Sequence, residues 1–210
     1  MMRVLAISDL HGYLPDIPEC DLFLLGGDYC PGRNLEQQRK FIHEKFTPWL
    51  RKIPARHIVG IAGNHDFIFQ QSPEIAEELP WIYLEDSEVE VETVRIYGSP
   101  WTPLFYDWAF MADEENLRMK FERIPEGLDV LLTHGPAYRH LDKTEEGVRA
   151  GSFALLERIN LVKPDSHVFG HIHEASGVED GEFTRFHNVS HVDAKYRQKR
   201  NSTTIHLKAA

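Results

Sequence analysis

The sequence predicts an α/β layered fold, on three observations. Short apolar runs rich in Val, Ile, Leu and Phe recur along the chain, and each ends in a cluster of polar residues. Runs of this length fit buried strands better than helices. Helix-like stretches lie between several of these runs, and such alternation is typical of layered α/β proteins. Near the C-terminus two strand-like runs, 182–190 and 202–207, follow each other without a helix, so part of the sheet is expected to be antiparallel.

The individual elements are expected in the following order. Six runs should contain strands: 3–9, 21–28, 57–66, 94–100, 129–136 and 166–173. Three helices should each begin after a residue whose side chain can cap the first turn: 35–50 after Asn34, 114–124 after Asp113 and 153–162 after Ser152. Proline lies in the last turn of the first helix and beyond the other two, at Pro48, Pro125 and Pro164. The basic segment 193–202 is expected to be a solvated loop.

Length and composition limit the function classes. A chain of 210 residues is long enough for one domain with a sizeable core, so a single domain over 1–210 is expected. The net charge of −10 argues against a long nucleic acid as partner, because phosphate backbones are bound by Lys and Arg surfaces. No apolar stretch approaches the ~18 residues of a membrane span, and no signal peptide is visible. We therefore expect a cytoplasmic protein with no membrane partner, and the oligomeric state stays open.

Metal-type ligands fall at the C-terminal ends of five of the expected strands. In open α/β sheets this edge is where ligands bind. Each segment alone is a weak signal, but five of them occur in order, each beside glycine, which permits tight turns and close approach of the backbone. Together they supply seven candidate ligands: Asp9, His11, Asp28, Asn64, His134, His171 and His173.

The chemistry of this set favours two metal ions. Carboxylate, amide oxygen and imidazole together suit Mn, Fe, Zn or Ni. Cys20 and Cys30 form neither a thiolate zinc motif nor a disulfide framework. Seven ligands are too many for one tetrahedral ion but suit two divalent ions that share a bridging carboxylate. The charge of two such ions exceeds that of two aspartates and a bridging hydroxide, so a small phosphate ester would be attracted despite the acidic surface.

Five short segments resemble the motif blocks of the calcineurin-like metallophosphoesterase superfamily. They are SDLHG, GGDYC, GNHD, THGP and GHIH; all five are intact and in order, over 9–173. The surrounding sequences YGSPWTP, IPEGLDVLLTHGP and HVFGHIHE further resemble the small metallophosphoesterase-domain-containing branch. The resemblance implies a four-layer αββα sandwich, two mixed β-sheets flanked by helices, with the metals at the strand ends.

Matching these motifs also implies a division of the ligands. The first metal ion would be held by Asp9, His11, Asp28 and His173, and the second by Asp28, Asn64, His134 and His171. Asp28 would bridge the two. If residues 171–173 continue an extended strand, neighbours two apart point the same way, so both histidines would face the centre. The cofactors would be two divalent ions, manganese first, with Fe, Zn or Ni as alternatives.

The resemblance further implies the reaction. A hydroxide that bridges the metals would be the nucleophile, and His65 would protonate the leaving alkoxide or stabilise developing charge. Asp66 would orient His65, with a helix N-cap role as the alternative. The expected partner is a small anionic phosphoester, and the first hypothesis is a phosphodiesterase acting on a cyclic or short nucleotide. A phosphomonoesterase on nucleotides or phosphoproteins, and a nucleotide-binding module with little turnover, remain open.

Side chains near the motifs are candidates for lining a substrate pocket, with core packing as the alternative: Tyr29, Arg33, Trp101, Phe105 and Tyr138. The loop SPWTPLFYDW, at 99–108, is expected to influence which substrate is accepted.

Overall fold

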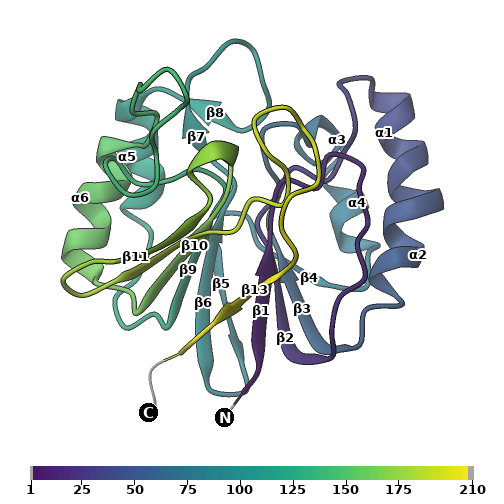
Figure 1. Cartoon of the computed structure of the whole chain (residues 1–210), viewed down its shortest axis with the longest axis horizontal. Coiled ribbons are helices and arrows are strands. Elements are labelled where there is room, and N and C mark those ends of the chain that lie inside the picture. The colour runs from purple at the N-terminus through teal and green to yellow at the C-terminus, as the bar shows by residue number, and fades with distance from the viewer. Residues whose placement is uncertain (1, 208–210) are drawn as a thin grey trace.

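The computed structural model describes residues 2–207 and arranges them in four layers (Figure 1). Two sheets pack face to face in the middle, α1 and α2 cover the outer face of one, and α5 and α6 cover the outer face of the other. The predicted four-layer αββα sandwich with two mixed sheets is confirmed. All loops that follow the parallel strands gather at the upper end of the view in Figure 1.

The first sheet has the strand order β13-β1-β2-β3-β4. Strands β1 to β4 are parallel, whereas β13 runs antiparallel to β1. Their bounds are Val4–Ile7 for β1, Cys20–Leu25 for β2, Ala55–Gly60 for β3, Ile82–Tyr83 for β4 and Thr203–Ile205 for β13. The helices that cover it are α1 (Leu35–Phe41), a π-helical turn (Ile42–Phe46), α2 (Thr47–Leu50), α3 (Phe67–Gln71) and α4 (Glu74–Glu77).

The second sheet has the order β11-β12-β10-β9-β6-β5. Its four inner strands are parallel and its two edge strands, β5 and β11, are antiparallel. The bounds are Ser87–Val91 for β5, Val94–Ser99 for β6, Val130–Thr133 for β9, Ser166–Phe169 for β10, Gly177–Asp180 for β11 and Arg185–Asn188 for β12. Helices α5 (Glu114–Phe121) and α6 (Phe153–Val162) cover this sheet, and a short parallel pair, β7 (Thr102–Pro103) and β8 (Met111–Ala112), lies beyond β6.

The inner strands are apolar on both faces because both faces are covered. In β1, Val4 and Ala6 point into the core between the two sheets, whereas Leu5 and Ile7 point toward the helices. All four side chains are at most 2% exposed. This alternation explains why the strands read as continuous hydrophobic runs, and it makes the sheets a rigid support for the polar residues that follow them.

The predicted helix starts are confirmed at all three caps. The side chains of Asn34, Asp113 and Ser152 accept hydrogen bonds from the N–H groups of Gln37 (3.0 Å), Asn116 (2.9 Å) and Leu155 (3.2 Å). Pro48, in the last turn of the first expected helix, follows the π-helical turn Ile42–Phe46 by two residues. Proline cannot donate a backbone hydrogen bond and its ring crowds the preceding turn, so the helix widens before it resumes as α2.

The six expected strands are present, but the C-terminal runs belong to different sheets. Strand β12 pairs parallel to β10 and antiparallel to β11, whereas β13 returns to pair with β1. Between them the chain crosses beside the end of β1, where the N–H of Ser8 donates to the carbonyl of Val189 (3.1 Å) and the N–H of His191 donates to that of Ser8 (2.8 Å). The crossing lies next to Asp9 and ties the two sheets together.

Two further expectations concern the buried interior. Cys20 and Cys30 are buried free thiols, as expected. Tyr29 does not line a pocket, because it is fully buried and its ring stacks on Phe46 with centroids 4.7 Å apart.

Within residues 2–207, none of the helices combines the length and the apolar character needed to cross a membrane.

The hydroxyl of Tyr29 joins the ends of β2 and β3 and generates a stability prediction. It accepts a hydrogen bond from the N–H of Gly27 (3.2 Å) and lies 2.5 Å from the carbonyl oxygen of Ile61. Tyr29→Phe should lower the free energy of unfolding by about 1–3 kcal/mol, because these buried backbone groups lose their partner. The measurement is urea unfolding followed by circular dichroism.

Tyr97→Phe is the matched control for this prediction. The Tyr97 side chain is also buried, but its hydroxyl has no hydrogen-bond partner among the described residues. Its removal should leave the free energy of unfolding unchanged or slightly raised. Equal losses in the two variants would contradict the role given to the Tyr29 hydroxyl.

Candidate metal centre

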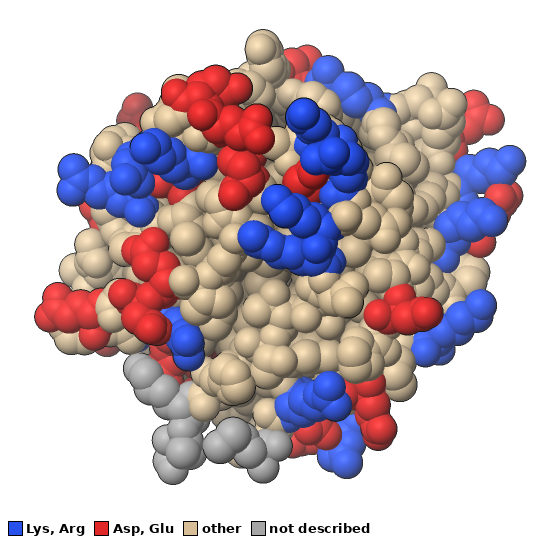
Figure 2. Space-filling view, in the orientation of Figure 1, with Lys and Arg blue, Asp and Glu red and all other residues tan. Residues whose placement is uncertain are grey.

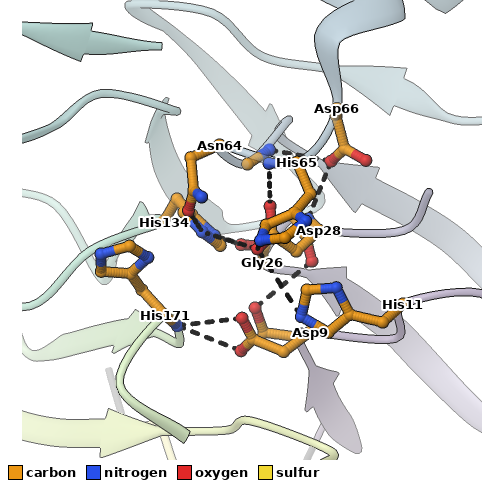
Figure 3. Close-up of polar contacts among 12 residues, drawn as sticks. Asp9, His11, Gly26, Asp28, Asn64, His65, Asp66, His134 and His171 are labelled. Atoms are coloured by element: carbon orange, nitrogen blue, oxygen red, sulfur yellow. Dashed lines mark hydrogen bonds and ion pairs between the residues drawn. The ribbon is translucent and has the colours of Figure 1, made fainter. Parts of the chain in front are cut away.

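The seven predicted ligand residues follow strands that finish at one end of the sandwich (Figure 1), and Figure 3 labels all of them except His173. They come from both sheets: Asp9 and His11 follow β1, Asp28 follows β2, Asn64 follows β3, His134 follows β9, and His171 and His173 follow β10. Because parallel strands present their carboxyl ends at one edge, segments distant in sequence deliver side chains to one place.

The chain turns sharply at several of these residues. Asp9, His11, Asp28 and His171 have φ angles of 57°, 44°, 59° and 68°. Residues other than glycine seldom occupy this left-handed region, and such strain persists where the surroundings enforce it, often at functional sites. Here the enforcing contacts include hydrogen bonds from the N–H of Asp9 to the Gly27 carbonyl (3.0 Å) and from the N–H of His11 to the Asp28 carbonyl (2.9 Å).

One group of ligand atoms forms around Asp9. The Nε2 atom of His173 lies 3.4 Å from Oδ1 of Asp9 and 3.2 Å from Nε2 of His11. The same nitrogen of His11 is 3.7 Å from Oδ2 of Asp28. Single ligand atoms of Asp9, His11 and His173 all lie within 4.8 Å of one another, so one cation can contact all three.

A second group forms around His134, on the other side of Asp28. The Nε2 atom of His134 lies 3.4 Å from Oδ2 of Asp28 and 2.8 Å from Oδ1 of Asn64. Its Nδ1 atom lies 2.8 Å from the carbonyl oxygen of Gly26, to which it can only donate. Such a hydrogen bond fixes the tautomer and directs Nε2 at the centre, as is usual for imidazole ligands. Asp28 therefore lies between the two groups.

The last two histidines reach the centre by a turn, so the condition of an extended strand through 171–173 is not met. Strand β10 ends at Phe169, His171 has a left-handed backbone, and His173 begins a 3₁₀ turn. The N–H of His171 points at the Asp9 carboxylate, 3.1 Å from each oxygen (Figure 3). Its ring lies beside that of His134, with centroids 5.1 Å apart, whereas His173 faces Asp9. The His171 ring thus lies beside the group around His134, and the His173 ring belongs to the group around Asp9.

The charges at the centre suit a cation. Asp9 and Asp28 are 0% and 1% exposed. Burial alone would raise the pKa of Asp28, but the charges of His134 and His65 hold it well below its usual range. Burial lowers the pKa of His11 to about 4 and that of His171 to about 3. The carboxylates are therefore ionised and these imidazoles neutral, which is the state in which they bind metal.

The pKa of His134 is shifted in the opposite direction from those of His11 and His171. Burial opposes its charged form, but the negative charge of Asp28 prevails and raises the pKa of His134 to about 9. A proton and a metal ion therefore compete for Nε2 of His134. Two buried carboxylates need positive charge for compensation, of which a proton on His134 supplies only part, and the carboxylate, amide and imidazole donors fit a borderline divalent ion.

His65 lies at the rim of the centre. Its backbone N–H donates to Oδ1 of Asp28 (2.7 Å), and its Nε2 atom lies 4.0 Å from Oδ2 of the same residue. The side chain is partly exposed, unlike the buried Asp28 carboxylate below it. From this position the His65 ring can contact a substrate that binds on the solvent side of the centre.

Asp66 has a different role from both that were predicted. Its carboxylate accepts hydrogen bonds from four backbone N–H groups, those of Asp28 (2.8 Å), Tyr29 (2.9 Å), Cys30 (3.0 Å) and Gly63 (2.9 Å). It makes no capping hydrogen bond to helix α3. The carboxylate therefore fixes the loop after β2 to the loop after β3, which holds Asp28 in place and leaves the His65 ring to other contacts.

Two aromatic residues at the rim were not predicted as site residues. Trp108 packs on His65 with ring centroids 4.1 Å apart. Tyr196 packs on His11 (4.7 Å) and His173 (5.2 Å), so the segment 193–202 is not simply a solvated loop. The position of Tyr196 in the sequence gives no sign of its contacts with His11 and His173. Trp108 was within reach of prediction, because it ends the loop expected to influence substrate choice.

Comparisons with known proteins agree with this geometry. The model of the calcineurin-like phosphoesterase family matches residues 2–175, which include all seven candidate ligands. Human metallophosphoesterase domain-containing protein 1 is 35% identical over 225 residues, covering 93% of this chain and 68% of that protein. A UPF0046 protein of Caenorhabditis elegans is 44% identical over 223 residues, covering 89% of this chain and 55% of the worm protein. The solved structure of phosphopantetheinyl hydrolase from Mycobacterium tuberculosis shares the fold, with a TM-score of 0.65 at 14% identity over 97% of this chain and 95% of that one.

The backbone at Gly170 lies close to the side chains of Asp9 and Ser8, and this generates a prediction. A methyl group there would overlap the Asp9 carboxylate and the Ser8 hydroxyl. Gly170→Ala should therefore displace Asp9 and lower the metal content per chain, as measured by elemental analysis after dialysis against Mn²⁺. In Gly177→Ala, the control, the added methyl group would have no neighbour closer than 3.9 Å, so the metal content should not change. Wild-type metal content in a folded Gly170→Ala protein would contradict the assignment of Asp9.

Proposed function

The chain belongs to the calcineurin-like phosphoesterase family, and we propose that it hydrolyses small phosphodiesters at a two-metal centre. Membership makes it a metal-dependent phosphoesterase, and its relatives place it in the small metallophosphoesterase-domain-containing branch. The observation that carries the proposal is the position of Asp28, buried between the ligand group of Asp9 and that of His134.

The proposed ligands divide as the motifs imply. Asp9, His11 and His173 would hold one ion, Asn64, His134 and His171 the other, and Asp28 both. When bound, two divalent ions ~3.5–4 Å apart lower the pKa of water and stabilise the charge of a phosphoryl group in an in-line displacement. We propose Mn²⁺ as the resident ion, with Fe, Zn and Ni as alternatives, because all suit this donor set.

His65 supports the departure of the leaving group. Its Nε2 atom points into the centre beside Asp28 and its side chain is partly open to solvent. When hydroxide attacks phosphorus and the bond from phosphorus to the leaving oxygen breaks, the proton on Nε2 of His65 passes to that oxygen. His65 gives up this proton as an imidazolium and is left neutral, and the alcohol departs neutral. The next water molecule returns a proton to His65 and becomes the hydroxide of the following turnover.

Charge favours a small substrate with a single negative charge. The net charge of −10 repels anions at a distance, and it repels a phosphomonoester dianion more than a phosphodiester. At short range the loop that carries Tyr196 can still attract an anion of either charge, because it exposes Lys195, Arg197, Lys199 and Arg200. Figure 2 shows Lys and Arg gathered in the middle of one face, where Figure 1 shows this loop. We propose no long nucleic acid and no membrane as partner.

A paired assay tests the class of substrate. Metal-free protein is supplied with Mn²⁺, Ni²⁺ or Zn²⁺ and then offered bis-p-nitrophenyl phosphate and p-nitrophenyl phosphate separately. Preference for the diester is the expected result. Preference for the monoester would indicate a phosphomonoesterase, and turnover of neither would indicate a binding module; both results would overturn the proposal.

The role of His65 gives a kinetic prediction. On a dinucleoside monophosphate, whose leaving group is a basic alkoxide, His65→Ala should lower kcat by about 10²–10⁴, the usual contribution of acid catalysis. The metal content should be unchanged, since His65 is not among the proposed ligands. His43→Ala, at an exposed histidine of the π-helical turn, is the control and should have wild-type kcat. Equal turnover by the two variants would remove His65 from the reaction.

A further inference from the structure

The orientation of the His65 ring depends on aromatic packing. Its ring centroid lies 4.1 Å from that of Trp108, with 39° between the planes. The ring of His11 contacts it at nearly a right angle, with centroids 4.6 Å apart. Asp66, the neighbour in sequence that could have held the ring, uses its carboxylate to bind the backbone of the adjoining loops.

Trp108 is itself held in place by Arg33. The guanidinium carbon of Arg33 lies 4.1 Å from the centre of the Trp108 ring. The indole therefore contacts the Arg33 guanidinium as closely as it contacts the His65 ring. The guanidinium also donates a hydrogen bond to the carbonyl of Asp107 and lies 5.2 Å from the Phe67 ring.

The backbone anchors Trp108 next to the centre. The N–H of Ala109 donates to the carbonyl of Asn64 (3.1 Å), which precedes His65. The loop is closed at its base by the hydrogen bond from the N–H of Thr102 to the carbonyl of Phe110 (2.9 Å). The indole ring therefore moves with the segment that carries His65, whereas the tip of the loop, at Leu104, Phe105 and Tyr106, is exposed.

We propose that Arg33 and Trp108 are positioning residues that clamp His65 in the orientation needed for proton donation. The inference deepens the proposed function and rests on it for the kinetic consequence. Stacking fixes the plane of the imidazole, and the cation above the indole restrains the stack. A proton donor works only within hydrogen-bond reach of the leaving oxygen, so a ring free to tilt transfers its proton less often.

Leaving groups of different basicity reveal such a defect. p-Nitrophenolate departs readily without a proton, whereas phenolate, with a pKa near the ~10 of tyrosine, depends more on a donor. In Trp108→Ala, kcat on diphenyl phosphate should fall by about tenfold or more while KM and the kcat on bis-p-nitrophenyl phosphate stay within about twofold. Trp108→Phe should restore most of the lost kcat, and Arg33→Ala should show a smaller loss of the same kind.

A spectroscopic measurement tests the clamp without turnover. In the proton NMR spectrum of the full chain, the Cε1–H resonance of His65 should be displaced by the ring current of Trp108, and Trp108→Ala should remove that displacement. Phe183→Ala is the control, because that exposed aromatic side chain precedes β12 and contacts Lys163, and it should change neither the resonance nor the rates.

The outcomes separate the clamp from the proposed function. Equal losses of kcat on both esters in Trp108→Ala, or a His65 resonance that does not move, would overturn the clamp. If the wild-type protein hydrolyses neither ester, the proposed function fails, and the His65 resonance in Trp108→Ala and Arg33→Ala alone decides whether these two residues hold His65.

Discussion

The burial of two carboxylates in one place is the constraint on which the rest of the site depends. Asp9 and Asp28 are removed from water at the ends of neighbouring strands, and like charges in such surroundings are unfavourable unless a cation compensates them. The imidazoles around them supply part of that charge when protonated, and divalent ions supply more. This explains why the site draws on five segments, since no single segment could surround two carboxylates with enough donors.

The fold supports this arrangement by rigidity. Apolar strands packed on both faces fix the starting point of each loop, and the left-handed turns at Asp9 and Asp28 direct the side chains at the centre. The Asp66 carboxylate joins two of the loops, and the crossing at Ser8 and Ser190 joins the two sheets beside Asp9. Such a site changes little when ions bind, because its ligands are already close together.

Local features were readable from the sequence, and long-range contacts were not. Side chains that cap a helix act within three residues, so Asn34, Asp113 and Ser152 identified their helices correctly. The seven candidate ligands could also be identified, because they fall in five segments that each contain a glycine at a strand end. Whether the chain turns at His171 stayed open, because nothing in a histidine signals a positive φ. The packing of Trp108 on His65 and of Tyr196 on His11 joins segments far apart in the chain, and sequence alone does not specify which surface loops meet.

The central claim is that Asp28 lies between two metal ions, and anomalous diffraction from crystals grown with Mn²⁺ tests it most directly. The account predicts two anomalous peaks per chain, ~3.5–4 Å apart, one near Asp9, His11 and His173 and the other near Asn64, His134 and His171, with the Asp28 carboxylate contacting both. A single peak, or two peaks with Asp28 bound to neither, would contradict it.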